Sequence, residues 1–281
     1  MTYSELMTAG VKLLSDAGFP EARTDARTLM FHVTGMDFMA LLRDGALQAD
    51  KEQEERFFRL LEERRKHVPV QYIVGEQEFC GLRFAVQPGV LIPRPETELL
   101  TEAVFTQSAG KRVLDMCTGS GCIAVTVAKL GKPVYVAASD DSAEALAVAK
   151  KNAELQEVPV TFFQGDLFEN VEGVYDIIVS NPPYIQSKVI EDLMPEVRDF
   201  EPRMALDGWS DGLLFYRRIV RDAKAFLAPG GKLLFEIGHD QGRTVPEILL
   251  AEGYREIEVK KDYAGLDRMV FAVWPGDNKE I

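Results

Sequence analysis

The spacing of hydrophobic positions changes twice along the chain. From Leu6 to about Lys66, apolar residues recur every three or four positions, as they do in amphipathic helices. Between Pro69 and Pro95, short apolar runs at 71–75, 78–86 and 90–92 alternate with glycine and proline, which indicates extended segments and a β-hairpin. From residue 111 onward, short apolar runs alternate with helical patterns. This alternation predicts an α/β, doubly wound sheet.

The last region predicts a mostly parallel sheet that ends in an antiparallel hairpin. The predicted strands are 113–115, 134–138, 160–163, 177–179 and 231–236, with 254–259 and 268–274 as the hairpin. The predicted helices are 123–129, 143–155, 213–227 and 245–252, and a helix through Leu99 and Val104 is expected to be capped by Thr97 or a neighbour. We therefore predict a helical domain (1–68), a β-hairpin linker (69–95) and a doubly wound domain (96–281).

Composition and charge restrict the function classes. The 281 residues are 46% hydrophobic, which is typical of a globular protein large enough for two domains. The net charge of −13 disfavours sequence-nonspecific binding of nucleic acid. The N-terminal residues lack a signal-peptide pattern and no apolar run approaches membrane-spanning length, so we expect a cytoplasmic protein. The three cysteines and three histidines lack metal-ligand spacing, so neither a disulfide framework nor a metal site is predicted.

The strand at 177–179 runs directly into Asn181-Pro182-Pro183-Tyr184. The prolines lack N–H donors and end the strand ladder, so the chain turns outward at the carboxyl end of the strand, where open α/β sheets bind ligands. The Asn181 side-chain oxygen and the Pro182 carbonyl can accept both N–H bonds of a planar amino group, and the Tyr184 ring can stack on it. This turn predicts a clamp for alkylation of a planar amine, although four such residues also suit a purely structural turn.

A second turn has the features of a nucleoside site. Asp115 to Gly121 joins the first strand to a helix, and its two glycines let the backbone approach a ligand at the helix N-terminus. Asp140 follows Gly119 by about 20 positions, the interval at which an acid accepts hydrogen bonds from ribose hydroxyls. Asp166 and Leu167 follow the third strand, where an aspartate that merely caps a turn is equally compatible. NAD suits the same geometry, but the nearby amine clamp favours S-adenosylmethionine.

Taken together, these motifs resemble the HemK/PrmC family, the glutamine N5-methyltransferases of peptide-chain release factors. The resemblance covers nearly the whole chain and rests on Pro69–Gly75, Leu91–Glu98, Asp115–Gly121, Asn181–Tyr184, Glu201-Pro202, Ala205-Leu206, Asp211–Leu213 and Asp267-Arg268. It implies a Rossmann-like methyltransferase domain with S-adenosyl-L-methionine as cofactor. It also implies that the substrate is the glutamine of the Gly-Gly-Gln loop of class I release factors, recognised with the help of the helical domain.

The resemblance assigns roles to individual residues. It implies that Asn181, Pro182 and Tyr184 are catalytic and that they bind the glutamine together with Pro183. The cofactor-binding residues that it implies are Asp115, Cys117, Thr118, Gly119, Ser120, Gly121, Asp140, Asp166, Leu167 and Asn181. No nucleic acid, membrane or metal is expected at the site, and the protein is expected to be a monomer.

Two positions depart from the pattern of the family. Cys117 stands where many members carry glycine, and a cysteine would be strained there if the position requires a positive φ. Leu167 stands where some relatives carry tryptophan. A leucine at this position would stack on adenine more weakly than a tryptophan.

Three other functions are compatible with parts of the pattern. An adenine-N6 nucleic-acid methyltransferase uses the same clamp, but the acidic charge argues against it, and the residues after Tyr184 are needed to finish the sheet. A ribosomal-protein glutamine methyltransferase shares the chemistry, but the segment Pro93–Glu98 favours the release-factor branch. A non-enzymatic module that keeps only a cofactor pocket is disfavoured by the intact clamp.

Overall fold

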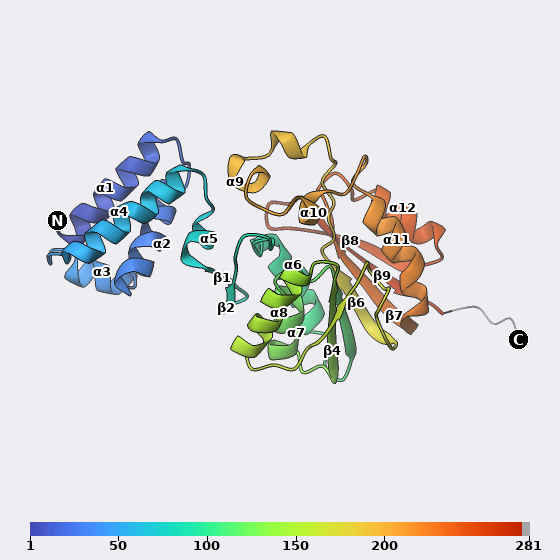
Figure 1. Cartoon of the computed structure of the whole chain (residues 1–281). Helices are drawn as coiled ribbons and strands as arrows, with labels where there is room; N and C mark the ends of the chain where they lie inside the picture. Colours follow the sequence, from blue (N-terminus) through green and yellow to red (C-terminus); the bar gives the residue numbers. More distant parts are fainter. Residues whose placement is uncertain (277–281) are drawn as a thin grey trace, which may run out of the picture. The chain divides into compact units, whose positions relative to one another are not determined.

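The computed structural model describes residues 1–276 and contains two compact units (Figure 1). The first unit consists of Met1–Glu76 together with the short segment Met194–Phe200. The second unit consists of Gln77–Leu193 and the chain from Glu201 onward. The helical pattern and the doubly wound pattern therefore correspond to separate packed bodies, which are described in turn.

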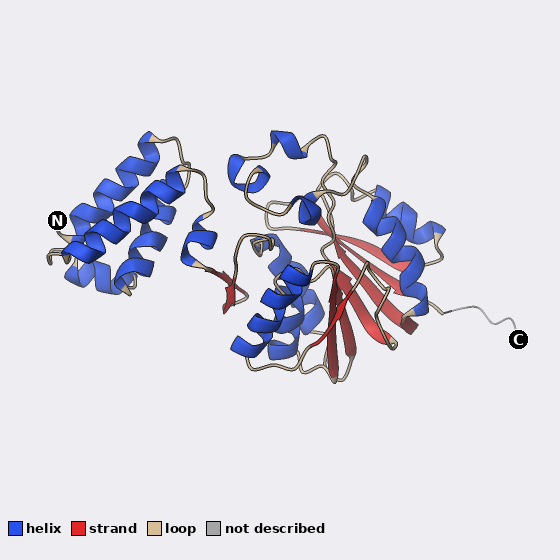
Figure 2. Cartoon of the chain, in the orientation of Figure 1, coloured by secondary structure: helices blue, strands red, loops and turns tan. Residues whose placement is uncertain are grey.

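The first unit is built of helices (Figure 2). Its helices are α1 (Tyr3–Asp16), α2 (Ala22–Thr34), α3 (Phe38–Asp44), α4 (Lys51–Arg65), α5 (Val70–Val74) and α9 (Pro195–Arg198). Apolar side chains at the predicted spacing form its core, and Leu14, Leu29 and Phe57 are fully buried. The helix α1 begins with a capping box, in which Thr2 and Glu5 bond each other's backbone N–H groups. The predicted helical region is confirmed.

The extended structure predicted at 71–75 is wrong, because these residues belong to the short helix α5. Pro69 lies at the N-cap, and Gly75 closes the helix in the left-handed conformation, donating its N–H to the carbonyl of Gln71 at 2.8 Å. The predicted hairpin is present as β1 (Glu76–Phe79) and β2 (Leu82–Ala85). Residues 90–92 form no strand, and their hydrophobicity is explained by the burial of Val90 and Ile92.

Seven strands of the second unit form the predicted sheet, in the order β5-β4-β3-β6-β7-β9-β8. The parallel strands are β3 (Arg112–Met116), β4 (Tyr135–Asp140), β5 (Thr161–Gln164), β6 (Tyr175–Ser180) and β7 (Leu227–Glu236). The strands β8 (Arg255–Lys261) and β9 (Asp267–Trp274) complete it as an antiparallel hairpin. The strand order reverses between β3 and β6, which makes the carboxyl ends of these two strands the expected place for a ligand.

Helices cover both faces of the sheet (Figure 2). One core contains side chains of α6 (Pro95–Phe105), α7 (Cys122–Leu130) and α8 (Ala143–Leu155), and the other contains side chains of α11 (Leu214–Asp222) and α12 (Thr244–Ala251). Along β6, Ile178 belongs to the second core, whereas Ile177 and Val179 belong to the first. The continuous apolar run of β6 is thus explained by burial on both faces.

Two local predictions in this unit are wrong. Neither Thr97 nor a neighbour caps α6 through its side chain: the helix begins at Pro95, the N-cap residue Arg94 makes no side-chain capping hydrogen bond, and the Thr97 hydroxyl donates to the Glu236 carboxylate. The predicted strand at 231–236 begins earlier, at Leu227, which pairs with Tyr175. The Pro229-Gly-Gly stretch therefore lies inside β7 as an irregularity of register, rather than as a turn before it.

The helical unit contains a buried guanidinium that holds two segments distant in the sequence. Arg64 donates to Asp25 at 2.7 Å and to Glu196 at 2.8 Å, and its guanidinium lies 4.2 Å from the centre of the Phe19 ring. It also donates to the carbonyl of Val68 at 3.2 Å. Because the Asp25 side chain is exposed by less than a tenth, it would be left as an uncompensated buried charge without Arg64.

We predict that Arg64→Met lowers the free energy of unfolding by about 3–5 kcal/mol, because Asp25 loses its buried partner. The measurement is urea denaturation of the full chain, followed by far-ultraviolet circular dichroism. The adjacent Arg65 is the matched control, since its ion pair with Glu62 is about half exposed. The substitution Arg65→Met should cost less than about 1 kcal/mol. Equal losses in both variants would contradict a special role for Arg64.

Candidate active site

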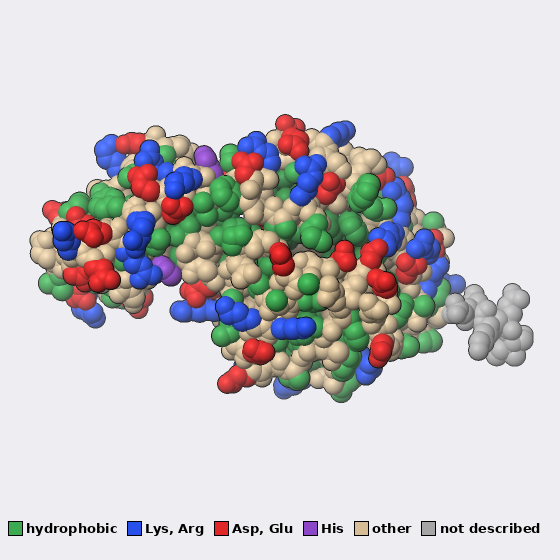
Figure 3. All heavy atoms as spheres, in the orientation of Figure 1, with side chains coloured by type: hydrophobic (Ala, Val, Ile, Leu, Met, Phe, Trp, Pro, Cys, Tyr) green, Lys and Arg blue, Asp and Glu red, His purple; other side chains and the backbone are tan. Residues whose placement is uncertain are grey.

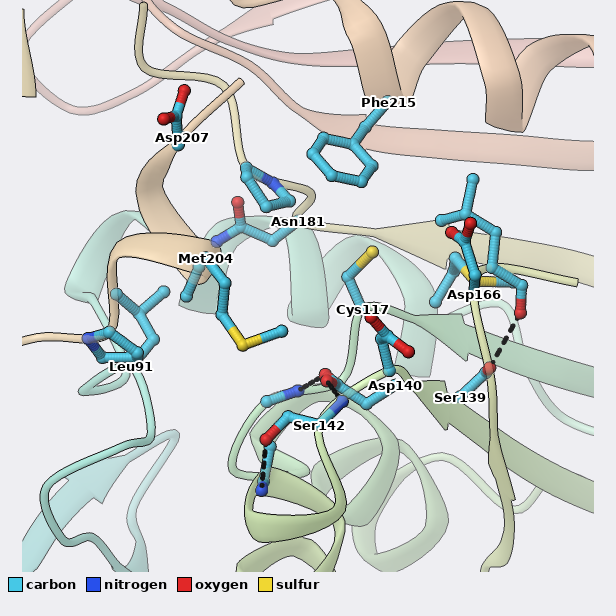
Figure 4. A pocket seen from close by; sticks show the side chains of 18 of the residues that line it. Leu91, Cys117, Ser139, Asp140, Ser142, Asp166, Asn181, Met204, Asp207 and Phe215 are labelled. Carbon is cyan, nitrogen blue, oxygen red and sulfur yellow. Dashed lines mark hydrogen bonds between the residues drawn. The ribbon is translucent and has the colours of Figure 1, made fainter. Parts of the chain in front are cut away.

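A cavity of about 530 Å³ lies at the carboxyl ends of β3, β4 and β6 (Figure 4). Among the predicted site residues, Cys117, Gly119, Asp140, Asp166, Leu167, Asn181 and Pro183 line it. The structure thus brings together residues from four separate turns, at the position where the strand order reverses. The remaining predicted residues, which are Asp115, Thr118, Ser120, Gly121, Pro182 and Tyr184, do not line the cavity and lie in the turns around it.

The Asn-Pro-Pro-Tyr turn follows the last paired residue of β6. Ser180 pairs with Met116 of β3 and with Phe235 of β7, and the ladder stops there because two prolines follow. The Asn181 side-chain nitrogen donates to the Thr97 hydroxyl at 3.2 Å. Within residues 1–276, neither the Asn181 side-chain oxygen nor the Pro182 carbonyl accepts a hydrogen bond. Both acceptors of the predicted clamp are therefore available to a substrate.

Tyr184 is oriented by contacts outside the cavity. Its hydroxyl lies 3.4 Å from an oxygen of Glu236, and its main-chain carbonyl accepts a hydrogen bond from Gln241 at 3.2 Å. A Cβ atom at Gly212 would clash with this carbonyl oxygen. The loop at Gly212 therefore packs directly on the backbone of the turn and holds it in place. The predicted stacking of the Tyr184 ring on a planar substrate stays a prediction.

The two glycines of the first turn have different structural roles. Gly119 has φ +56°, and a Cβ atom there would meet no protein atom within 4 Å, so its backbone is open toward the cavity that it lines. Gly121 has φ +79°, and its Cβ would lie 2.9 Å from the Ala149 Cβ of α8. The second glycine therefore permits α7 and α8 to pack closely, whereas the first leaves room for a ligand.

Asp140 is held by backbone donors at the floor of the cavity (Figure 4). Its carboxylate accepts hydrogen bonds from the N–H of Gly119 at 2.8 Å and from the N–H of Ser142 at 2.9 Å. Burial raises the pKa of Asp140, while these two hydrogen bonds lower it. Each carboxylate oxygen retains accepting capacity, which suits the hydroxyls of a ribose. The turn, the open Gly119 backbone and Asp140 thus fit the nucleoside part of S-adenosylmethionine.

Asp115 lies beneath the turn and is completely buried. One carboxylate oxygen accepts from the Thr118 hydroxyl at 2.5 Å and from the N–H of Ala124 at 3.1 Å, while the other has no hydrogen-bond partner. Burial raises the pKa of Asp115 to about 7. Asp115 therefore fixes the turn between β3 and α7. The neighbouring Thr118 and Ser120 are also buried.

Both departures from the family pattern have left-handed backbone conformations. Cys117 has φ +60°, which meets the condition under which a cysteine is strained. Leu167 has φ +56°, and its carbonyl accepts a hydrogen bond from the Ser139 hydroxyl at 3.0 Å. Asp166, the residue before it, pairs with Arg218 of α11 at 2.8 Å. Packing from β4 and α11 thus holds this loop in an unfavourable conformation.

The cavity has walls that the motifs did not identify. Phe215 of α11 adds an aromatic ring. Met204, in the short helix α10 (Arg203–Leu206), and Trp209, just after it, add exposed apolar side chains. The other unpredicted lining residues are Gly89, Val90, Leu91, Met116, Ser139, Asp141, Ser142, Ala145, Pro202, Arg203, Ala205, Asp207, Leu214 and Arg218. The motifs Leu91–Glu98, Glu201-Pro202 and Ala205-Leu206 pointed to part of this wall, whereas Phe215 lies in no motif.

On the face shown in Figure 3, acidic and basic side chains are interspersed. Within residues 1–276, no helix has both the length and the apolar content that a membrane span requires.

Comparison with known proteins gives a consistent family assignment. Residues 5–75 match the family model of the PrmC N-terminal domain, and residues 94–197 match that of the methyltransferase small domain. The release factor glutamine methyltransferase of Clostridium acetobutylicum is 42% identical, over 90% of this chain and 91% of the relative. The enzyme of the same name from Cereibacter sphaeroides is also 42% identical, over 98% of this chain and 99% of the relative.

Solved structures support the fold. A methyltransferase from Pyrococcus furiosus superimposes with a TM-score of 0.55 at 22% identity, covering 70% of this chain and 91% of that one. The likeness confirms the predicted methyltransferase fold, whose mostly parallel sheet ends in an antiparallel hairpin. Because the sequence relatives match over nearly their full length at well above 30% identity, this chain belongs to the family of release factor glutamine methyltransferases.

Proposed function

We propose that this protein methylates the side-chain nitrogen (N5) of the glutamine in the Gly-Gly-Gln loop of class I peptide-chain release factors. The observation that carries the proposal is the pair of free acceptors, the Asn181 oxygen and the Pro182 carbonyl, at the edge of a nucleoside-sized cavity. The relatives that share the family are named for the same reaction. The cofactor of this family is S-adenosyl-L-methionine. When it is bound, it supplies a methyl group that is attached to a sulfonium ion.

The clamp addresses the main chemical difficulty of the reaction. The nitrogen of a carboxamide is a poor nucleophile because its lone pair is delocalised into the carbonyl. Two acceptors on one turn hold both N–H bonds of the amide, so that the nitrogen keeps one orientation during attack. When bound, the cofactor would give its methyl group to this nitrogen and be left as a neutral thioether. The nitrogen, which alkylation makes acidic, would lose its extra proton to solvent. The task of the protein is alignment, and strong base catalysis is not needed.

The other side of the cavity suits the nucleoside. The Asp140 carboxylate would accept the ribose hydroxyls, and the open backbone at Gly119 would lie against the ligand. Leu167 and Phe215 give an apolar wall for the adenine ring. Because Phe215 is aromatic, it offers the stacking surface that Leu167 lacks.

The remaining features complete the proposal. The helical region 1–68 would recognise the release factor, 69–95 would link it, and 96–281 would carry the catalytic domain; the match of residues 5–75 to the PrmC N-terminal domain supports this division. The protein would act in the cytoplasm, as a monomer and without direct contact with nucleic acid. The net charge of −13 is the reason to prefer a protein substrate over adenine in nucleic acid.

The first test is transfer of a labelled methyl group. Purified protein and labelled S-adenosylmethionine should label a class I release factor at the loop glutamine. A release factor with alanine in place of that glutamine is the control and should stay unlabelled. Label on DNA or on a ribosomal protein, with the release factor unmodified, would overturn the substrate assignment.

Asn181→Ala should lower kcat by about 10³-fold, because the amide loses one of the groups that orient it. Cofactor affinity, measured by calorimetry, should be largely preserved. Asn170→Ala is the matched control, since this exposed asparagine donates to the carbonyl of Gln164 and lies outside the cavity. Full activity of Asn181→Ala would remove Asn181 from the mechanism.

Asp140→Asn should weaken cofactor binding by about 10- to 100-fold, because hydrogen bonds to a charged acceptor are stronger than those to a neutral one. At saturating cofactor, kcat should be retained. Since burial raises the pKa of Asp140, wild-type affinity should fall as the pH is lowered and the carboxylate takes up a proton. An Asp140→Asn variant that binds as tightly as wild type would contradict the ribose assignment.

A further inference from the structure

A buried hydroxyl and a buried carboxylate hold Asn181 from behind. The Asn181 side-chain nitrogen donates to the Thr97 hydroxyl at 3.2 Å, and that hydroxyl donates to Glu236 at 2.6 Å. Thr97 belongs to α6, and Glu236 is the last residue of β7. Their exposed fractions are 2% and 1%, so water does not compete for these bonds.

The chemistry of these groups sets the direction of each hydrogen bond. An ionised carboxylate can only accept, so Thr97 must give its single hydroxyl proton to Glu236. The Thr97 oxygen is then left as an acceptor, and only the NH2 end of the Asn181 amide can satisfy it. As a result, the Asn181 oxygen is the end left for the substrate.

We propose that Thr97 and Glu236 are positioning residues for methyl transfer, which determine the end of the Asn181 amide that faces the substrate. The inference rests on the proposed function and adds a requirement to it, namely that Glu236 be ionised. A protonated Glu236 can donate to Thr97, whose hydroxyl can then donate to the Asn181 oxygen. The Asn181 NH2 group would then face the N–H bonds of the substrate, and two donors repel each other.

The groups around Glu236 place its ionisation in an accessible pH range. Burial raises the pKa of Glu236 to about 7, although the hydrogen bond from Thr97 and the charge of Arg268 on β9 lower it. Glu96 of α6 raises the pKa further, and the Tyr184 hydroxyl at 3.4 Å lowers it. On the other face, Tyr216 of α11 donates to the main-chain carbonyl of Glu236 at 2.8 Å. The charge of Glu236 also raises the pKa of the Cys122 thiol of α7.

Substitution of Thr97 tests the arrangement by its effect on kcat. Thr97→Val keeps the shape and removes the hydroxyl, so kcat should fall by about 10²-fold, with KM for the release factor and Kd for the cofactor unchanged. Thr97→Ser restores the hydroxyl and should recover most of the activity. Thr126→Val is the matched control: Thr126 is equally buried, its hydroxyl has no hydrogen-bond partner, and kcat should not change.

The pH profile tests Glu236. At saturating cofactor and release factor, wild-type kcat should rise with pH through about 7, as Glu236 ionises. In Glu236→Gln, which has nearly the same shape, this inflection should disappear. Ionisation of Asp115 or Asp140 acts on cofactor binding. The Kd for the cofactor should therefore still depend on pH in both wild type and Glu236→Gln.

The outcomes separate this inference from the proposed function. Suppose that wild type methylates the glutamine. A normal kcat in Thr97→Val, or an unchanged inflection in the pH profile of Glu236→Gln, then overturns the positioning role and leaves the proposed function intact. If wild type methylates no release factor, the proposed function fails. In that case the NMR chemical shifts of the Asn181 side-chain amide are followed as the pH is varied. A titration midpoint near pH 7 in wild type that is lost in Glu236→Gln supports the inference, and the same midpoint in both proteins overturns it.

Discussion

Two consecutive prolines stop β6 at Ser180, between two parallel neighbours that pair with it up to that residue. Without N–H donors at 182 and 183 the ladder cannot continue, so the chain leaves the sheet where the strand order reverses. The register places Asn181 beside Cys117, which follows β3, and beside Glu236, which ends β7. The cofactor turn and the buried carboxylate therefore reach the clamp from opposite sides, and the position of each depends on where β6 ends.

Much of the fold could be predicted because its signals are local. Apolar runs buried on two faces, such as 177–179, and helical spacing over 143–155 each identify their element within a short window. The exceptions are short segments in which a tertiary contact decides. Val70–Val74 has the composition of a strand but is helical, since Gly75 closes it and Val70 and Tyr72 pack in the core. Leu227 extends β7 because Tyr175 pairs with it across an irregular register, which a Pro-Gly-Gly signal conceals.

The parts of the site that could be predicted are those whose residues lie together on a single turn. Asn181, Gly119 and Asp140 follow strands, and the carboxyl ends of parallel strands meet at one edge of a sheet. Phe215 and Met204 also line the cavity, but they come from helices between β6 and β7 and bear no local mark of ligand contact. Thr97 and Glu236 are 139 positions apart, and no pattern of spacing relates them. The sequence favours Thr97 or a neighbour as a helix cap instead, because threonine is among the residues preferred at helix N-caps.

Stability alone does not account for a carboxylate at position 236. Burial favours its protonated form, and a folded-state pKa of about 7 lies above the ordinary value of 4.5. Between these values the folded protein binds more protons than the unfolded chain, so stability falls as the pH rises through this window, by roughly 3 kcal/mol in total. A well-packed apolar residue would avoid this cost. The ionised form, which destabilises the fold, is the form that leaves the Asn181 oxygen free for a substrate amide, and this is the physical reason to connect Glu236 with catalysis.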